Sequence, residues 1–400
     1  MPSPDQPHPR QSAKIEAVKN IAILGSTGSI GTSTLSICEQ FPDRFTPVAL
    51  AAGSNVEVAC QQALRWRPRL ISMATEPLAA ELRARLQSPD IEVVHGTAGT
   101  IAVATHPDVN FVVSAIVGVA GLEATYAAAL AGKDIGLANK EALVAAGDLI
   151  LAAAARSGSA LLPIDSEHNA IHQAMRGGSP REVKQIWLTA SGGPFRNTPL
   201  ADFAHITPQQ ALKHPTWVMG QRITIDSATM LNKGLEIIEA CRLFNLPPDK
   251  VRVTVHPQST VHSLVEFIDG SILAQISVTD MRLPILYALA YPERPASNLT
   301  FDLAHLAHLD FEQPDLVRFP CLRLAYEAAA AGPSACIALN AADEIAVAAF
   351  LAGSIPFPGI PSTIERVLEL TPAAAPESIS GVLAADEAAR ACAREVIARA

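Results

Sequence analysis

The chain has 400 residues, of which 49% are hydrophobic and 17% are charged, and its formal net charge is -9. This balance is typical of a globular protein and excludes a disordered chain, while the length exceeds what one hydrophobic core usually holds. From this length we expect two or three domains. No basic cluster is dense enough to follow a phosphate backbone, so we expect no nucleic-acid partner.

Neither cysteines nor apolar segments indicate a secreted or membrane protein. None of the six cysteines is part of a C-x-x-C pair, which is typical of reduced thiols. The longest apolar run, residues 111–122, is shorter than the ~18 residues of a membrane span. Residues 1–20 are polar and lack the apolar core of a signal peptide, so we interpret them as a loose extension. We therefore expect a cytoplasmic protein without a membrane partner.

Residues 21–160 alternate short apolar strands with helices. This alternation predicts a Rossmann-like parallel sheet with right-handed crossovers, covered by helices on both faces. We expect strands at 21–24, 47–50, 70–73, 91–94, 111–114 and 134–137, and helices that include 32–39, 56–66 and 121–131.

A glycine-rich turn joins the first strand to its helix, with Gly25, Gly28 and Gly31 at regular spacing. Glycines let the backbone approach a pyrophosphate, and the helix N-terminus offers free N–H groups. This pattern favours a dinucleotide site; an ordinary strand–helix turn is the alternative.

The end of the second strand indicates which dinucleotide binds. An NAD site usually has a carboxylate about 20 residues after the glycine turn, to bind the ribose 2′-hydroxyl. Here Gly53, Ser54 and Asn55 carry no carboxylate, which favours NADP over NAD. No lysine or arginine is adjacent to clamp a 2′-phosphate, so the preference rests on hydrogen bonds from Ser54 and Asn55.

The pattern changes after residue 160. Residues 161–290 predict a mixed α+β catalytic domain with strands at 161–164, 186–189, 251–255, 263–267 and 272–277, and helices at 208–212 and 235–244. Residues 291–314 contain prolines, histidines and little periodicity, and we interpret them as a linker. Residues 315–400 are rich in alanine and predict a C-terminal helical domain.

Two carboxylates follow the strand at 161–164. Asp165 and Glu167 are separated by one residue, and such positions of a strand face the same way. Two adjacent carboxylates repel each other unless a cation lies between them, and oxygen ligands suit Mg²⁺ or Mn²⁺. A solvated loop is the alternative interpretation.

The segment from Asp226 to Glu236 adds a third carboxylate. Asn232 and Glu236 are four residues apart, on one face of a helix, with Lys233 beside them. Serine, asparagine and lysine side chains together form a phosphate clamp. The alternative is a surface helix that Asp226 or Ser227 caps.

Three further segments carry polar groups. The loop at 189–195 offers Ser191 and glycine-freed N–H groups for a phosphate, and the loop at 213–220 contains His214 and Trp217, either as a lid over a ligand or as a hydrophobic anchor. Asn139, Lys140 and Glu141 follow the strand at 134–137, at the edge where parallel sheets bind ligands.

Taken together, these segments resemble the 1-deoxy-D-xylulose 5-phosphate reductoisomerases of the non-mevalonate isoprenoid pathway, from about residue 21 to about residue 353. The motifs that carry the resemblance stand in one order, at residues 25–31, 139–141, 162–168, 191–195, 214–217, 226–236, 256–259 and 338–342.

The resemblance implies roles for matching positions. The cofactor NADPH would contact Thr27, Gly28, Ser29, Ile30, Gly53, Ser54, Asn55, Asn139, Glu141 and Gly220. Mg²⁺ or Mn²⁺ would bind Asp165, Glu167 and Glu236. The sugar-phosphate substrate would contact Lys140, Ser166, Glu167, Ser191, His214, Ser227, Asn232, Lys233 and Glu236. The catalytic residues would be Lys140, Glu167, His214, Trp217 and Glu236, with Trp217 and Met219 in a mobile lid.

The resemblance also implies a homodimer and a reaction in which a metal-bound sugar phosphate rearranges to a branched aldehyde that NADPH reduces. Many relatives carry a basic residue where Ser54 stands, which leaves the rejection of NADH open. Two other functions remain to be distinguished: a simple NADP-dependent sugar-phosphate dehydrogenase, and a non-catalytic NADP sensor.

Overall fold

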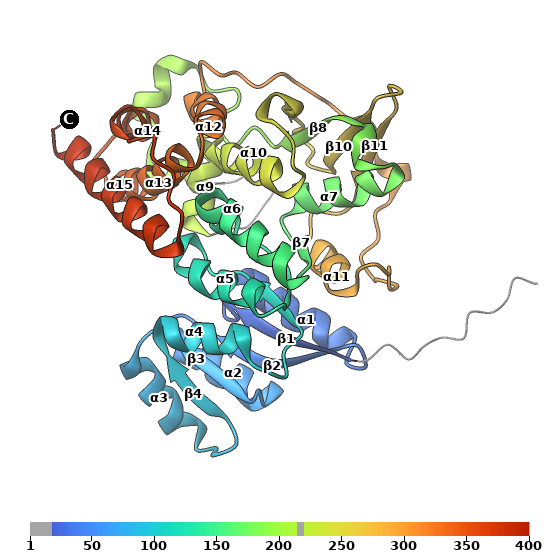
Figure 1. The fold of residues 1–400 in the computed structure, drawn as a ribbon. Coiled ribbons are helices and arrows are strands. Elements are labelled where there is room, and N and C mark those ends of the chain that lie inside the picture. Colours follow the sequence, from blue (N-terminus) through green and yellow to red (C-terminus); the bar gives the residue numbers. More distant parts are fainter. Residues whose placement is uncertain (1–17, 214–219, 400) are drawn as a thin grey trace, which may run out of the picture.

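The computed structural model describes residues 18–213 and 220–399. Figure 1 shows a parallel sheet with helices on both faces, a second sheet beside it and a bundle of C-terminal helices. His214, Trp217 and Met219 lie outside the described residues. The predictions for these three side chains therefore stay predictions.

Seven strands form the parallel sheet predicted for the first region. They are β1 (Lys19–Leu24), β2 (Phe45–Ala51), β3 (Leu70–Met73), β4 (Glu92–His95), β5 (Phe111–Ser114), β6 (Asp134–Leu137) and β7 (Leu161–Pro163). Their spatial order is β4-β3-β2-β1-β5-β6-β7, and all neighbours are parallel. The chain changes direction across the sheet between β1 and β5, which is where such folds bind ligands.

Helices cover both faces of this sheet, as the uniformly apolar strands predict. They are α1 (Ser29–Gln40), α2 (Val56–Trp66), α3 (Glu76–Leu86), α4 (Gly96–Thr105), α5 (Leu122–Leu130), α6 (Lys140–Ser157) and α11 (Arg282–Ala290). One buried cluster joins the sheet to α1, α2, α3 and α11, and another joins it to α4, α5 and α6. The apolar strands are therefore buried from two sides.

The strand predicted at 161–164 belongs to the parallel sheet and not to the second sheet. We grouped it with the second region, but β7 pairs with β6 and forms one edge of the parallel sheet. The division of the chain into domains stays a prediction.

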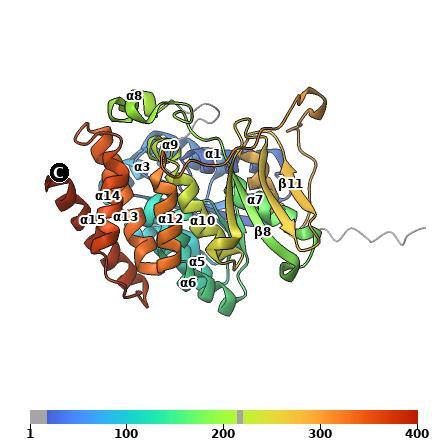
Figure 2. The same ribbon diagram turned by 90° about the horizontal axis from the view of Figure 1, so that it is seen from above.

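The second sheet has four strands, β8 (Val183–Ala190), β9 (Val251–Val255), β10 (Val261–Phe267) and β11 (Ile272–Ile276). Their order is β11-β10-β8-β9, and only β8 and β9 are parallel. Helix α7 (Ser166–Ala174) contacts β10 and β11. Figure 2 shows this sheet on the opposite side of the molecule from the C-terminal helices. Three helices belong to the same region: α8 (Pro208–Ala211), α9 (Gln221–Ala228) and α10 (Leu231–Leu243).

Helices α7, α9 and α11 were absent from the sequence prediction, and the patterns of α7 and α11 show why. Helix α7 contains few apolar residues, so its periodicity is weak, and α11 is apolar on every side and carries Pro284 near its start. Helix α11 lacks the one-sided apolar stripe that identifies an amphipathic helix, and in α7 that stripe consists of only Ala170, Ile171 and Ala174. Both helices owe their place to burial between other elements.

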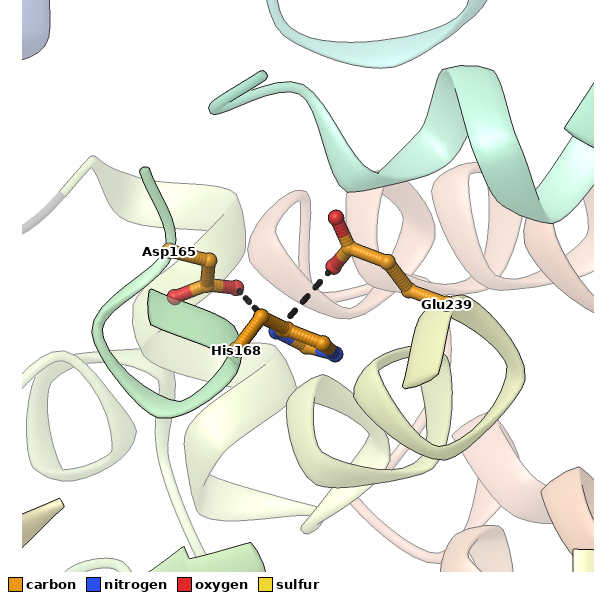
Figure 3. Close-up of side chains that lie close together, drawn as sticks. All are labelled: Asp165, His168 and Glu239. Carbon is orange, nitrogen blue, oxygen red and sulfur yellow. Dashed lines mark ion pairs between the residues drawn. The ribbon is translucent and has the colours of Figure 1, made fainter. Parts of the chain in front are cut away.

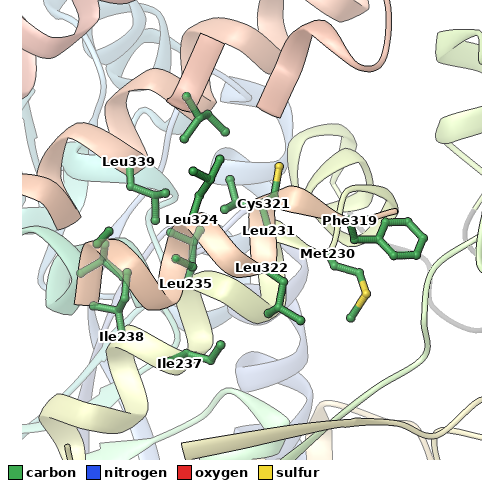
Figure 4. Packing of buried hydrophobic residues seen from close by; sticks show 14 of the residues in the cluster. Met230, Leu231, Leu235, Ile237, Ile238, Phe319, Cys321, Leu322, Leu324 and Leu339 are labelled. Carbon is green, nitrogen blue, oxygen red and sulfur yellow. The ribbon is translucent and has the colours of Figure 1, made fainter. Parts of the chain in front are cut away.

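The C-terminal region is helical, as predicted. It contains α12 (Pro320–Ala331), α13 (Pro333–Leu351), α14 (Gly359–Leu370) and α15 (Ile379–Arg399). These helices share one apolar core with α10 and the second sheet. Figure 4 shows Leu235 of α10 beside Leu324 of α12 and Leu339 of α13.

Helix α13 is the one described helix that is long and apolar enough to cross a membrane, and 67% of its apolar window is buried inside the fold. Helix α13 therefore packs as a core helix.

The remaining short helical turns are at Gly118–Gly121, Met175–Gly177, Pro180–Glu182, Leu200–His205, Pro248–Lys250 and Leu303–His305.

Candidate active site

The glycine turn is built by close backbone contacts at the end of β1. Gly25 has a φ of +87°, and a side chain there would approach the carbonyl oxygen of Ala115 to 2.7 Å. A side chain at Gly31 would overlap the backbone of Gly25 and Ser26. The N–H groups of Gly25 and Ser26 bond to the carbonyl of Ala51 at the end of β2. Glycine is therefore required for the geometry of the turn itself.

Helix α1 starts immediately after this turn. Gly28 occupies its N-cap without a side-chain hydrogen bond, and no acidic residue lies in its first turn. Thr27 and Ile30 are half-buried, while Gly28 and Ser29 are exposed. The first-turn N–H groups and the positive end of the helix dipole thus face an accessible surface that suits a phosphate.

The predicted ribose end of the cofactor site follows β2. Gly53, Ser54 and Asn55 are exposed, and the side chain of Asn55 caps α2 by accepting a hydrogen bond from the N–H of Val58 at 3.1 Å. Ser54 therefore remains the accessible hydroxyl beside this loop.

Asn139 and Glu141 lie at the start of α6. The amide of Asn139 donates to the carbonyl of Gly118 at 3.0 Å and to that of Ile116, and its oxygen caps α6 through Ala142. Asn139 therefore links the start of α6 to the backbone at Ile116 and Gly118, beside the predicted cofactor site. The carboxylate of Glu141 pairs with Arg222 of α9 at 3.0 Å. Gly220 is the N-cap of the same helix.

Three carboxylates predicted to bind a metal meet in one place. Asp165, Glu167 and Glu236 each offer an oxygen, and these atoms lie within 4.8 Å of one another. The predicted convergence is correct, but its reason was wrong: β7 ends at Pro163, and Glu167 lies in the first turn of α7. A helix turn, and not the alternation of a strand, brings the two side chains together.

Two lysines lie among these carboxylates. The ammonium of Lys140 is 2.5 Å from Asp165 and 3.0 Å from Glu236, and Lys233 pairs with Glu236 and lies 3.5 Å from Glu167. Each of these five side chains is 16% exposed or less. Buried charges require such partners, since each alone would cost several kcal/mol.

The carboxylates differ in proton affinity. Burial, with the negative charges of Glu236 and Asp165, raises the pKa of Glu167 to about 7. Burial acts the same way on Asp165, but the charges of Lys140, His168 and Lys233 and the hydrogen bond from Lys140 together outweigh it and bring the pKa of Asp165 down to about 2. Three hard oxygen donors that repel one another in a buried site fit a divalent cation such as Mg²⁺ or Mn²⁺.

The predicted phosphate clamp lies next to the carboxylates. Asn232 donates to Glu236 at 2.6 Å and accepts from Lys140 at 2.9 Å, and Ser166 donates to Glu167 at 2.8 Å. Ser191 belongs to a loop that touches α9, because a side chain at Gly193 would come within 2.7 Å of the carbonyl of Ser227. The loop and α9 thus bring both serines to one region.

The capping interpretation of this segment was wrong. Asp226 and Ser227 lie inside α9, while the N-cap of α10 is Met230 with a φ of +61°. Asp226 is buried and pairs with Arg222. It therefore belongs to the cluster around Arg222.

Sequence reasoning missed one group behind the three predicted metal ligands. The ring Nε2 of His168 lies 2.9 Å from the carbonyl of Glu236, which can only accept, so Nε2 carries the hydrogen. Its Nδ1 faces Glu239 at 3.4 Å and Asp165 at 3.9 Å, as Figure 3 shows. Burial raises the pKa of Glu239 well above its usual range and lowers the pKa of His168, so burial disfavours the charged form of both groups. Glu239 was detectable, because it lies one helical turn after Glu236.

Comparison with known proteins identifies the family. Residues 21–147 match 1-deoxy-D-xylulose 5-phosphate reductoisomerase, residues 161–244 match a C-terminal domain of that enzyme, and residues 276–392 match the DXP reductoisomerase C-terminal domain. The chain is 52% identical to 1-deoxy-D-xylulose 5-phosphate reductoisomerase of Methylococcus capsulatus, covering 95% of this chain and 99% of that protein. The chain belongs to the 1-deoxy-D-xylulose 5-phosphate reductoisomerase family.

Solved reductoisomerase structures have the same fold. The Zymomonas mobilis enzyme in complex with NADPH is 44% identical and superposes with a TM-score of 0.90, covering 95% of this chain and 99% of that chain. A DOX-P reductoisomerase in complex with NADPH, fosmidomycin and magnesium is 43% identical with a TM-score of 0.89, covering 95% and 98%. The predicted fold class is thereby confirmed.

The structure brings together two sets of the predicted site residues. The carboxylates, both lysines and Asn232 form one buried cluster. The glycine turn and the 53–55 loop meet at the ends of β1 and β2. His214 and Trp217 lie outside the described residues.

Proposed function

We propose that this chain catalyses the NADPH-dependent rearrangement and reduction of 1-deoxy-D-xylulose 5-phosphate to 2-C-methyl-D-erythritol 4-phosphate, with Mg²⁺ or Mn²⁺. The observation that carries this proposal is the buried cluster of Asp165, Glu167 and Glu236 between two lysines. A dinucleotide-binding fold alone needs no such cluster, and a non-catalytic NADP sensor would have no use for it.

In the proposed site, Asp165, Glu167 and Glu236 hold the divalent cation. When bound, the cation supplies Lewis acidity to neighbouring carbonyl and hydroxyl oxygens of the sugar phosphate. Lys140 stabilises negative charge that develops on the substrate, because its ammonium already lies among the ligand oxygens.

The remaining side chains hold the two substrates in register. We assign the substrate phosphate to Ser191, Ser227, Asn232 and Lys233, and the cofactor to the glycine turn, the 53–55 loop and Gly220. Asn139, Lys140 and Glu141 are consecutive, and Lys140 enters the carboxylate cluster. In this assignment the cofactor contacts adjoin the residue that enters the carboxylate cluster, as hydride transfer to a substrate bound there requires.

The assignment of the lid is part of the same proposal. His214 and Trp217 lie in the segment that precedes α9, and we assign them to substrate contact and to exclusion of water. A variant Trp217→Ala tests this assignment: it should raise the KM of the sugar phosphate and leave the Kd of NADPH unchanged.

We propose further that the protein is a cytoplasmic homodimer. Strand β11 lies at the edge of its sheet and exposes Ile272, Leu273 and Ile276, which supports a protein partner there. All six cysteines are free thiols, which supports a reducing compartment. Sedimentation equilibrium measures the oligomeric state, and a monomer at micromolar concentration would contradict the dimer.

The enzymatic proposal is tested by NADPH oxidation with 1-deoxy-D-xylulose 5-phosphate. Turnover should require both the sugar phosphate and a divalent cation, and a chelator should abolish it. NMR of the product distinguishes the alternatives: a branched polyol phosphate supports the proposal, and an unbranched one indicates a simple dehydrogenase. A parallel series with NADH measures how strongly the loop with Ser54 discriminates.

A further inference from the structure

A second buried charge cluster surrounds Arg222, away from the metal ligands. Its guanidinium bonds to Glu141 at 3.0 Å and Glu344 at 2.8 Å through one nitrogen, and to Asn340 at 2.9 Å and Asp343 at 3.2 Å through another. These partners come from α6 and α13, so one side chain of α9 joins three helices.

The cluster is expensive to bury, which argues for a specific role. Asp343 is fully buried, Glu141 is 8% exposed and Arg222 itself is 18% exposed. Asp226 lies 3.6 Å from the same guanidinium. Four carboxylates around one cation would repel each other strongly without it, while apolar residues would have packed at lower cost.

Glu141 is the member of the cluster that we assign to contact with the cofactor. It occupies the first turn of α6, next to Lys140, but the two side chains go to different clusters: Lys140 to the metal carboxylates and Glu141 to Arg222. A carboxylate in a site for an anionic cofactor needs a countercharge and a fixed orientation, and Arg222 supplies both.

The support of Arg222 comes from the C-terminal helices. Asn340, Asp343 and Glu344 lie on one face of α13, and a side chain at Gly118 would come within 3.1 Å of Glu344. Gly118 also accepts a hydrogen bond from Asn139, the residue that caps α6. Helix α13 therefore contacts the wall of the cofactor site from behind.

We propose that Arg222 is a positioning residue for the NADPH site: it fixes Glu141 and, through Asn340, Asp343 and Glu344, makes α13 the support of that site. The proposal rests on the proposed function for the identity of the cofactor. It predicts that the C-terminal helices govern cofactor affinity without touching the cofactor.

The test measures the Kd of NADPH by fluorescence titration for Arg222→Gln and Arg222→Lys. Loss of one charge-assisted hydrogen bond to Glu141 should raise the Kd about tenfold for the glutamine variant. Lysine retains the charge without the planar fork, so Arg222→Lys should lie between the wild type and Arg222→Gln. The KM of the sugar phosphate should change less than twofold.

Arg390→Gln is the matched control. Arg390 bonds to Glu344 and Asp386, and its side chain is 15% exposed, close to the 18% of Arg222. Among the described residues, its ion-pair partners do not include Glu141. This variant disturbs Glu344 but leaves the bond between Arg222 and Glu141 in place, so it should lower the Tm while raising the Kd of NADPH by less than Arg222→Gln does.

A double-mutant cycle with Glu141→Gln separates positioning from general stability. In the Glu141→Gln background, Arg222→Gln should cause little further loss of NADPH affinity, because the interaction it supports is already gone. Equal losses in both backgrounds, or an unchanged Kd in a folded Arg222→Gln protein, would overturn the proposal. If the wild type binds NADPH but turns over no sugar phosphate, the proposed function fails while this binding test remains valid.

Discussion

The glycine turn and the carboxylate cluster are built in opposite ways. The turn is made by seven consecutive residues, and its shape depends on backbone contacts such as that of Gly31 with Gly25 and Ser26. The cluster joins side chains from α6, the start of α7 and α10, which lie up to 96 residues apart. A local backbone site needs little from the rest of the fold, whereas a site of buried charges exists only once three helices pack.

This contrast predicts that the two sites fail independently. Glu236→Gln removes one ligand from the carboxylate cluster and should lower kcat by at least about 10²-fold, since even residues behind metal ligands contribute 10- to 100-fold. The Kd of NADPH should stay the same, because the glycine turn does not involve α10. Steady-state kinetics and fluorescence titration measure the two quantities.

Glu369→Gln is the control for that substitution, because Glu369 is exposed and, within the described part of the chain, forms an ion pair with the equally exposed Arg366. A parallel loss of NADPH affinity in Glu236→Gln would show that the two sites are coupled and would break the comparison.

The converse substitution acts on the glycine turn. Gly31→Ala places a methyl group against the backbone of Gly25 and Ser26, and overpacking of this kind costs about 1–3 kcal/mol. We expect the Kd of NADPH to rise at least about tenfold while Mg²⁺ affinity, measured by calorimetry, is unchanged. Gly381→Ala, at a distant helix start, should alter neither. Weakened Mg²⁺ binding in Gly31→Ala would contradict independence.

The carboxylate cluster should also respond to pH where the turn does not. Burial first, then the charges of Glu236 and Asp165, raises the pKa of Glu167 to about 7, and a metal ligand must be deprotonated to bind. Below pH 7 protons compete with the cation, so Mg²⁺ affinity should fall by about tenfold for each further pH unit. Calorimetry between pH 5.5 and 8.5, at roughly half-unit steps, measures this slope. A flat profile would show that Glu167 is not a ligand.

The smallest effect concerns the cluster around Arg222. Burial raises the pKa of Asp343 to about 6, so the folded protein binds a proton there that the unfolded chain releases at lower pH. Stability from this group is therefore present at acidic pH and lost as the pH rises through about 6.

Asp343→Asn keeps an acceptor for Arg222 without the charge and should raise the free energy of unfolding at neutral pH by on the order of 1–2 kcal/mol. The gain should vanish near the pKa of an unfolded aspartate, about 4. Urea unfolding at both pH values measures it, with Asp202→Asn on the exposed surface as the control. Equal gains at both pH values would show that the effect is not the charge of Asp343.

Most of the parallel sheet was predictable because its strands are apolar on both faces and its helices are separated by clear turns. The bounds of α2, β3 and β5 agree with the prediction to the residue. Helices α7 and α11 were not predictable, since one is polar and the other is apolar all round. Their conformation depends on the surfaces that bury them.

The sequence by itself determined the glycine turn and the membership of the carboxylate cluster. The glycine spacing indicates a turn in which side chains would clash with the backbone. Carboxylates close together in the sequence indicate that a cation is needed to offset their repulsion. Only the tertiary structure decided that Glu167 approaches Asp165 through a helix turn, that Glu239 and His168 lie behind them, and that Arg222 gathers four carboxylates from three helices. Charges interact through space and in proportion to their burial, and neither distance nor burial can be computed from residue order alone.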